Sequence, residues 1–233
     1  MNPVGSSGGY GLRDAADARG IITFDVGCDA AIWTDGPRIA QALKGGAAPI
    51  STNTGGTSWT TALTNPPSTT RTDSQQPEVD AHFFCGEAYA WYEALGAVPR
   101  AGWDDNKFVG KVETNMPVRV ITHVPNYDAA VHTCQSAYSR FDVQPVPTPA
   151  GPLLVPFLVF CDGDPALTWS GSPGMANRSI DFLAGSKMLV GHEYQHCITM
   201  FSFDHGGNPG IGYSRWTAAV HEGLSDVFGC LFS

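Results

Sequence analysis

Apolar and polar positions follow two different periods along this chain, and these periods predict both helices and strands. Over 80–95 the apolar residues recur at spacings of four, three and four, which is the period of one helix face. Two later segments, 180–201 and 217–232, are apolar on the same scale and also predict helices. The apolar stripe of the first helix, which we expect to pack into a core, consists of Phe84, Ala88, Trp91 and Leu95.

The alternating, β-branched run 117–124 predicts a strand, the apolar run 153–160 predicts a buried strand, and 21–24 and 31–33 resemble short strands. Pro156 interrupts the run 153–160, and because proline cannot donate to a strand ladder it indicates an edge strand or a bulge. The segment 45–77 is rich in Gly, Ser, Thr, Asn and Pro and predicts a long loop with little helix. The proline-rich segment 144–152 predicts a connection.

Composition limits the classes of protein to consider. Of the 233 residues, 42% are hydrophobic and 15% are charged, which is typical of a globular protein of one or two domains. The net charge of −9 argues against nucleic-acid binding. The longest apolar run, 153–160, is too short to span a bilayer, so no membrane segment is expected. Residues 1–9 lack the features of a signal peptide, so the chain is a mature part, a fragment, or preceded by a signal.

Six cysteines are present, and none forms a Cys-x-x-Cys pair, which argues against a cysteine-based zinc site. They allow up to three disulfides in a secreted protein. The alternative is that several are buried thiols. Cys85, Cys197 and Cys230 lie among apolar residues of predicted helices, which favours buried thiols for these three.

The most informative motif is the stretch 192–196, which reads His-Glu-Tyr-Gln-His. Two histidines four residues apart on a helix point the same way, so His192 and His196 can reach one metal ion. Glu193 stands beside the first ligand, where a carboxylate can take a proton from a metal-activated water. The alternative is an exposed helical turn carrying two unrelated histidines, and the apolar flanks of the motif argue against it.

A catalytic zinc site needs a third protein ligand, and the last predicted helix offers one. Glu222 and Asp226 lie one turn apart, so one can bind the metal while the other accepts the N–H of a ligating histidine. His221 precedes Glu222 and points about 100° away from it on a helix, so it is not assigned to the metal. His205, in a Gly/Asn-rich stretch, is the most plausible alternative ligand.

At these residues the chain resembles the thermolysin-like neutral metallopeptidases, a family of gluzincins. The helix that reads His-Glu-Gly-Leu-Ser-Asp-Val-Phe-Gly over 221–229 resembles the family's Glu-ligand helix. Weaker similarities run back to about Gly20. They comprise Val-Asp-Ala-His-Phe-Phe-Cys-Gly at 79–86, Arg-Gly-Ile-Ile-Thr-Phe-Asp at 19–25 and Cys-Asp-Gly-Asp at 161–164.

The resemblance implies an α+β, zincin-like fold. A loose segment 1–18 would precede a mostly-β lobe with helices at 19–178, and the active-site helices would occupy 179–233. It implies a secreted endopeptidase that binds Zn²⁺ through His192, His196 and Glu222, with peptides or proteins as substrates. Glu193 would be the general base and Asp226 would orient a ligand.

Further site residues follow from the same resemblance. Tyr213, nine residues before Glu222, matches the family's oxyanion donor, although a solvent-exposed loop tyrosine would look the same. Ala129 and Ala130 are a loose counterpart of the substrate-binding Asn-Ala pair. The family's apolar substrate pocket would be lined by Ile180, Leu183 and Leu189, which a buried helix face would require anyway.

Some positions depart from the family. Met188 stands where an Asp usually helps to bind a structural calcium pair, so the usual Ca²⁺ site is not expected. The family continues into a helical lobe after the position of Ser233, and the expectation is a natural product that extends further and a chain that alone cleaves peptides poorly. The alternative functions are a degenerate, zinc-binding structural domain or a metallohydrolase of non-peptide bonds.

Overall fold

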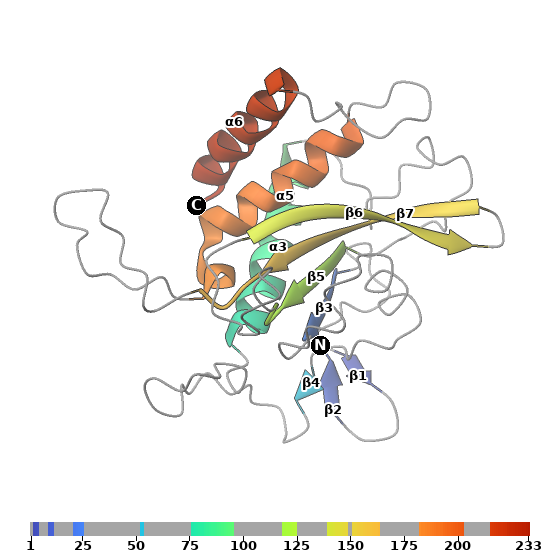
Figure 1. Ribbon diagram of the computed structural model, residues 1–233. Coiled ribbons are helices and arrows are strands. Elements are labelled where there is room, and N and C mark those ends of the chain that lie inside the picture. The colour runs from blue at the N-terminus through green and yellow to red at the C-terminus, as the bar shows by residue number, and fades with distance from the viewer. Residues whose placement is uncertain are drawn as a thin grey trace.

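The computed structural model describes residues 2–4, 9–11, 21–25, 52–53, 76–95, 118–124, 139–148, 151–163, 182–202 and 215–233. Its elements show the mixture of helices and strands of the predicted α+β class (Figure 1). In chain order they are β1 (Asn2–Val4), β2 (Gly9–Gly11), β3 (Ile21–Asp25), β4 (Thr52–Asn53), α3 (Gln76–Ala94), β5 (Val118–Thr122), β6 (Ser139–Thr148), β7 (Gly151–Phe160), the 3₁₀ helix η4 (Leu183–Gly185), α5 (Lys187–Ser202) and α6 (Arg215–Phe232).

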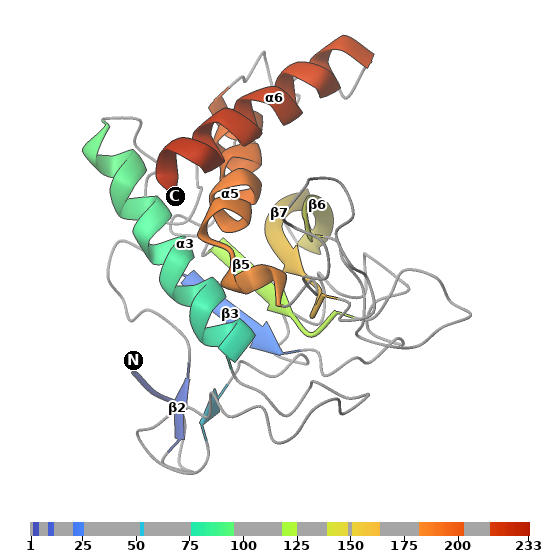
Figure 2. The same ribbon diagram turned by 90° about the vertical axis from the view of Figure 1, so that its left-hand side faces the viewer.

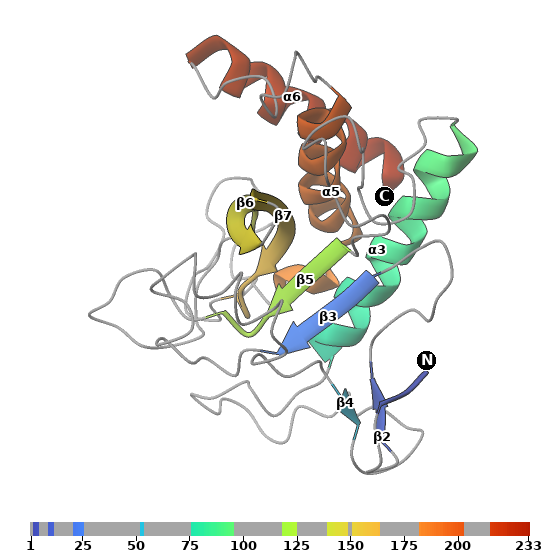
Figure 3. The same ribbon diagram turned by 90° about the vertical axis from the view of Figure 1, so that its right-hand side faces the viewer.

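The main sheet has four strands in the order β3-β5-β7-β6. Strands β3, β5 and β7 are parallel, and β6 runs antiparallel to β7 at the edge. The predicted strands at 21–24, 117–124 and 153–160 are therefore confirmed, while the one at 31–33 lies outside the described residues. A small second sheet, β1-β2-β4, lies apart from the main one (Figure 3).

The prediction of a connection at 144–152 is wrong, because most of this segment belongs to the long hairpin of β6 and β7. The prolines fit because β6 is an edge strand, where a missing N–H need not interrupt a ladder. Pro156 lies inside β7, which is an inner strand between β5 and β6, so the predicted edge strand is wrong for this run. Strand β7 pairs with β5 only from Phe157 to Val159, so Pro156 lies outside that ladder.

Helix α3 begins at Gln76, four residues before the predicted start. Pro77 is tolerated in a first turn because its N–H would have no partner there, and the carboxylate of Glu78 suits the positive end of the helix. The predicted apolar stripe is only partly correct. Ala88 is fully buried, but the side chain of Leu95 is 57% exposed, and the buried face is formed by Ala81, Cys85, Ala88, Tyr89 and Tyr92.

The helix predicted from residue 180 starts only at Lys187. The backbone of Ser186 is extended, and its Oγ accepts the N–H of Leu189 at 3.3 Å, which is the hydrogen bond of a helix N-cap. The apolar residues before it belong to η4. The apolar spacing of these residues continues the helical period, so the sequence did not indicate that α5 begins only at Lys187.

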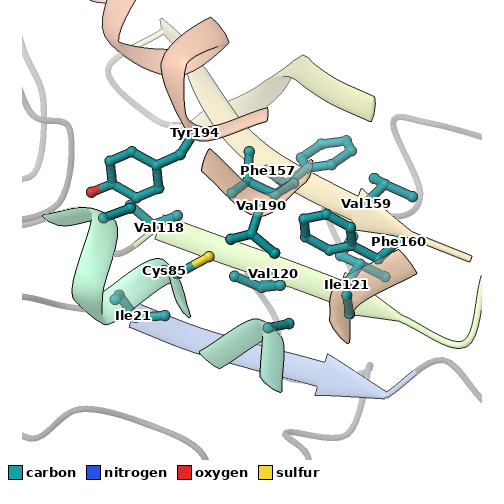
Figure 4. Close-up of a cluster of buried hydrophobic side chains, with 14 of the residues drawn as sticks. Ile21, Cys85, Val118, Val120, Ile121, Phe157, Val159, Phe160, Val190 and Tyr194 are labelled. Carbon is teal, nitrogen blue, oxygen red and sulfur yellow. The ribbon is translucent and has the colours of Figure 1, made fainter. Parts of the chain in front are cut away.

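Helices α3 and α5 pack on the sheet and enclose the core (Figure 2). Figure 4 shows how the side chains of the two helices meet those of the strands. The core includes Ile21, Val118, Val120, Ile121, Phe157, Val159 and Phe160 from the sheet, and Cys85, Val190 and Tyr194 from the helices.

The four cysteines among the described residues are free thiols. Cys85 and Cys197 are buried as predicted, and burial raises the pKa of each thiol well above its usual range. Cys161 is buried as well. The prediction of a buried thiol is wrong for Cys230, which is exposed.

A buried polar cluster of His123, Asp162 and Glu78 joins the ends of β5 and β7 to the first turn of α3. His123, which follows β5, lies with Nδ1 2.9 Å from Oδ2 of Asp162 and Nε2 3.2 Å from Oε2 of Glu78. Burial lowers the pKa of His123, but the hydrogen bonds and charges of Asp162 and Glu78 outweigh it and raise the pKa to about 11. His123 is therefore a buried cation at neutral pH.

This cluster predicts that the protein becomes less stable as the pH rises. The pKa of His123 is about 11 in the folded state, above the ordinary value of about 6.5. Its stabilising contribution is therefore complete below about pH 6.5 and is lost progressively towards pH 11. We expect the free energy of unfolding, measured by urea titration, to fall between about pH 6.5 and 8.5, and His123→Leu to flatten that decline. An equal slope in both proteins would contradict the prediction.

Candidate metal centre

Helix α5 directs both motif histidines towards α6, which lies beside it (Figures 1 and 2). A hydrogen bond from α3 and a second one within α5 fix the side chain of Gln195 in the motif turn. The hydroxyl of Tyr92 donates to Oε1 of Gln195 at 2.5 Å, and Nε2 of Gln195 donates to Oγ1 of Thr199 at 2.8 Å. Because Gln195 faces α3, His192 and His196, which lie on another side of α5, face α6.

The three predicted ligands meet at one point. Nε2 of His192 and Nε2 of His196 are 3.0 Å apart, and each is 3.4 Å from Oε2 of Glu222. His196 is almost fully buried, whereas the side chain of Glu222 is 49% exposed, so the site opens to solvent on the α6 side. Among the described residues this group alone could hold a metal ion.

Asp226 occupies the predicted orienting position. Its Oδ1 is 2.9 Å from Nδ1 of His192. When Nδ1 of His192 carries the proton and donates it to this carboxylate, the lone pair of Nε2 points to the other two ligand atoms. The carboxylate also makes the imidazole a better ligand, because it stabilises the positive charge that a metal draws onto the ring.

Replacing Asp226 with alanine is expected to weaken metal affinity by ~10–100-fold without removing a ligand. Asp226→Asn keeps an acceptor oxygen for the imidazole N–H and should lose less. Competition with a chromophoric chelator measures both affinities. An unchanged affinity in the alanine variant would show that Asp226 is only a surface residue of α6.

The other ring nitrogen of His196 has partners that the sequence did not reveal. Nδ1 of His196 is 2.5 Å from Nδ1 of His221 and 3.0 Å from Oγ of Ser225, and the two imidazoles stack. His221 is thus not one of the three converging ligands, as predicted, but it supports one of them. The sequence signals for these contacts were the polar side chains of His221, directly before Glu222, and of Ser225, three residues after it.

Both of these inner histidines favour the neutral form. Burial lowers the pKa of His196 to about 4; the charge of Glu222 opposes this shift, and the neighbouring His192 and His221 add to it. Burial also lowers the pKa of His221. At neutral pH His196 therefore presents an uncharged imidazole, which is the form that binds metals.

Glu193 lies beside the ligands but is not one of them. Its side chain is 4% exposed, and its Oε1 accepts a 2.7 Å hydrogen bond from Oγ of Ser139, the first residue of β6. The carboxylate is thus held between α5 and the edge of the sheet, next to the first ligand. Sequence reasoning missed Ser139, which lies 54 residues before Glu193 and carries no motif.

Two glycines let α5 and α6 approach closely enough to assemble the site. A Cβ at Gly229 would lie 2.7 Å from the backbone oxygen of Met188 and 3.1 Å from the backbone nitrogen of His192. A Cβ at Gly191 would lie 2.5 Å from the ring of Phe232. The absence of both side chains brings Glu222 and Asp226 within reach of the histidines.

The remaining residues predicted for the site lie outside the described residues or away from the three converging atoms. Tyr213, Ala129, Ala130, His205 and Ile180 lie outside the described residues. Leu183 is buried in η4, and Leu189 is half-buried and packs against the core. Met188 is 43% exposed, and its thioether sulfur lies 3.8 Å from the thiol of Cys230.

Comparison with models of known protein families gives no match for this chain, and comparison with curated proteins gives none either. None of the described helices is both long and apolar enough to cross a membrane. The interpretation of the site therefore depends on its own residues and geometry.

Proposed function

We propose that this protein is a zinc-dependent endopeptidase with a zincin-like fold, similar to the thermolysin-like neutral metallopeptidases. The observation that supports this proposal most strongly is the convergence of His192, His196 and Glu222, with the carboxylate of Glu193 buried beside them and hydrogen-bonded to Ser139. Three ligands and a separate carboxylate are the parts that a hydrolytic metal site requires. Secretion and the peptide or protein substrates belong to the same proposal.

The donor set and its spacing fit zinc. Two imidazole nitrogens and one carboxylate oxygen are a common catalytic zinc set. Ligands placed about 2.0–2.1 Å from a tetrahedral zinc ion lie roughly 3.3 Å from one another. The separations of 3.0, 3.4 and 3.4 Å between the three atoms match this value. A calcium or magnesium site would instead be built from oxygen atoms.

Each residue then has a defined task. When bound, zinc supplies Lewis acidity that makes a water molecule acidic near neutral pH and polarises a carbonyl oxygen. Glu193 accepts the proton of that water on a carboxylate oxygen and later delivers it to the leaving amine. Asp226 and His221 hold the two imidazoles in place. Tyr213, by its resemblance to the family position, donates a hydrogen bond to the developing oxyanion.

The proposal is tested with the purified 233-residue chain. We expect about one zinc ion per chain by elemental analysis, and a rise in melting temperature on adding zinc to chelated protein, because a ligand of the folded state must stabilise it. The chain alone should hydrolyse casein or a quenched peptide slowly, with this activity lost on chelation and restored by zinc. A chain without zinc or zinc-dependent stabilisation would refute the site. A chain that binds zinc but hydrolyses no peptide would be the degenerate domain.

A further inference from the structure

We propose that Ser139 is a positioning residue for the general base, and that its hydroxyl holds the Glu193 carboxylate in its working orientation. This inference rests on the proposed function. The hydroxyl of Ser139 donates to Oε1 of Glu193 at 2.7 Å, and this contact joins the edge strand of the sheet to the motif turn of α5. Hydrogen bonds to a carboxylate are among the stronger ones in proteins.

The sheet fixes the position of this hydroxyl. Ser139 pairs with Phe160 of β7, whose side chain is buried in the core. Strand β6 begins beside α5, as Figure 1 shows, and the two elements are in contact. Strand β6 is paired with β7 over its whole length, from Ser139 opposite Phe160 to Thr148 opposite Gly151. The donor is therefore held in place by the sheet.

The hydrogen bond from Ser139 restrains the carboxylate of Glu193. Glu193 has several rotatable bonds, and its carboxylate must face the water from which it takes a proton. Holding one oxygen leaves the other in a defined direction, and a misplacement of about 1 Å in such a site can lower the rate about 100-fold. A serine hydroxyl neither gains nor loses a proton near neutral pH, so Ser139 acts through Glu193 and carries no proton itself.

Kinetics of Ser139→Ala and Ser139→Thr test this assignment. The alanine variant should lower kcat on the order of 10–100-fold at an unchanged zinc content and a similar KM. Threonine keeps the hydroxyl and suits a strand, so it should restore most of kcat. Ser233→Ala, which removes an exposed hydroxyl that donates to the carbonyl of Cys230, is the matched control and should leave kcat unchanged.

A double-substitution cycle separates positioning from a general structural effect. In the Glu193→Gln background, Ser139→Ala should have little further effect, because the group it positions no longer transfers a proton. An equal loss of kcat in both backgrounds, a loss of zinc from Ser139→Ala, or an unchanged kcat would each overturn the proposal.

A second readout does not depend on activity. In crystals of the zinc-loaded chain, Glu193 should take one orientation in the wild type and in Ser139→Thr, and another or several in Ser139→Ala. An unchanged orientation in Ser139→Ala overturns this proposal even if the wild type hydrolyses no peptide. In that case the absence of hydrolysis refutes the proposed function separately.

Discussion

Replacing Glu193 with glutamine is expected to lower the rate of peptide hydrolysis by ~10²–10⁴-fold while the zinc ion stays bound. The substitution keeps the size of the side chain and an acceptor oxygen for the hydroxyl of Ser139. It removes the basic oxygen that takes the proton. Because Glu193 is not among the three converging atoms, the metal affinity should stay within about twofold of the wild-type value. Hydrolysis rates and elemental analysis of the same sample measure both quantities.

The matched control is Glu87→Gln on α3. Glu87 forms a partly exposed ion pair with Lys187, with 3.4 Å between the charged atoms, and such pairs contribute little to stability. Its activity should equal that of the wild type. If Glu193→Gln releases the metal, Glu193 is a ligand and the assignment of roles is wrong. If it retains full activity, another group carries the proton.

The sequence could predict the metal centre because its residues follow the period of a helix. His192 and His196 are one turn apart, as are Glu222 and Asp226, so each pair shares a helix face whatever the rest of the fold does. The structure confirms that the two faces meet. The supporting contacts were not predictable in this way. Ser139 reaches Glu193 from a strand far away in the sequence, and His221 supports His196 although it points away from Glu222.

Whether an element of the fold could be predicted depended on how clearly its own residues indicate a strand or a helix. Strands β3 and β5 are rich in β-branched residues and β7 in large apolar ones, so each could be predicted from its own residues. The hairpin at 139–160 was missed because prolines usually interrupt strands, and only the edge position of β6 makes them acceptable. The start of α5 was missed because the apolar spacing of η4 continues the helical period. Only the cap at Ser186 separates the two elements.

Adding one methyl group at Gly229 is expected to disturb the candidate metal centre by forcing α5 and α6 apart. The new Cβ would lie 2.7 Å from the backbone oxygen of Met188, and a backbone atom cannot turn aside as a flexible side chain can. The two helices must therefore move apart, and Glu222 and Asp226 move with α6. Alanine favours a helix over glycine by about 1 kcal/mol, whereas overpacking costs about 1–3 kcal/mol. We expect Gly229→Ala to lower the free energy of unfolding by up to about 2 kcal/mol.

The effect on metal binding should be larger than the effect on stability. A ligand atom must lie within about 0.2 Å of its proper distance, so even a small separation of the helices weakens zinc binding, by an expected tenfold or more. Gly223→Ala is the matched control on the same helix, because a Cβ at Gly223 would meet nothing within 4 Å. It should stabilise the protein by about 0.5–1 kcal/mol and leave zinc affinity unchanged. If both variants behaved alike in urea unfolding and chelator competition, the close approach of α5 and α6 at Gly229 would not be what brings Glu222 to the histidines.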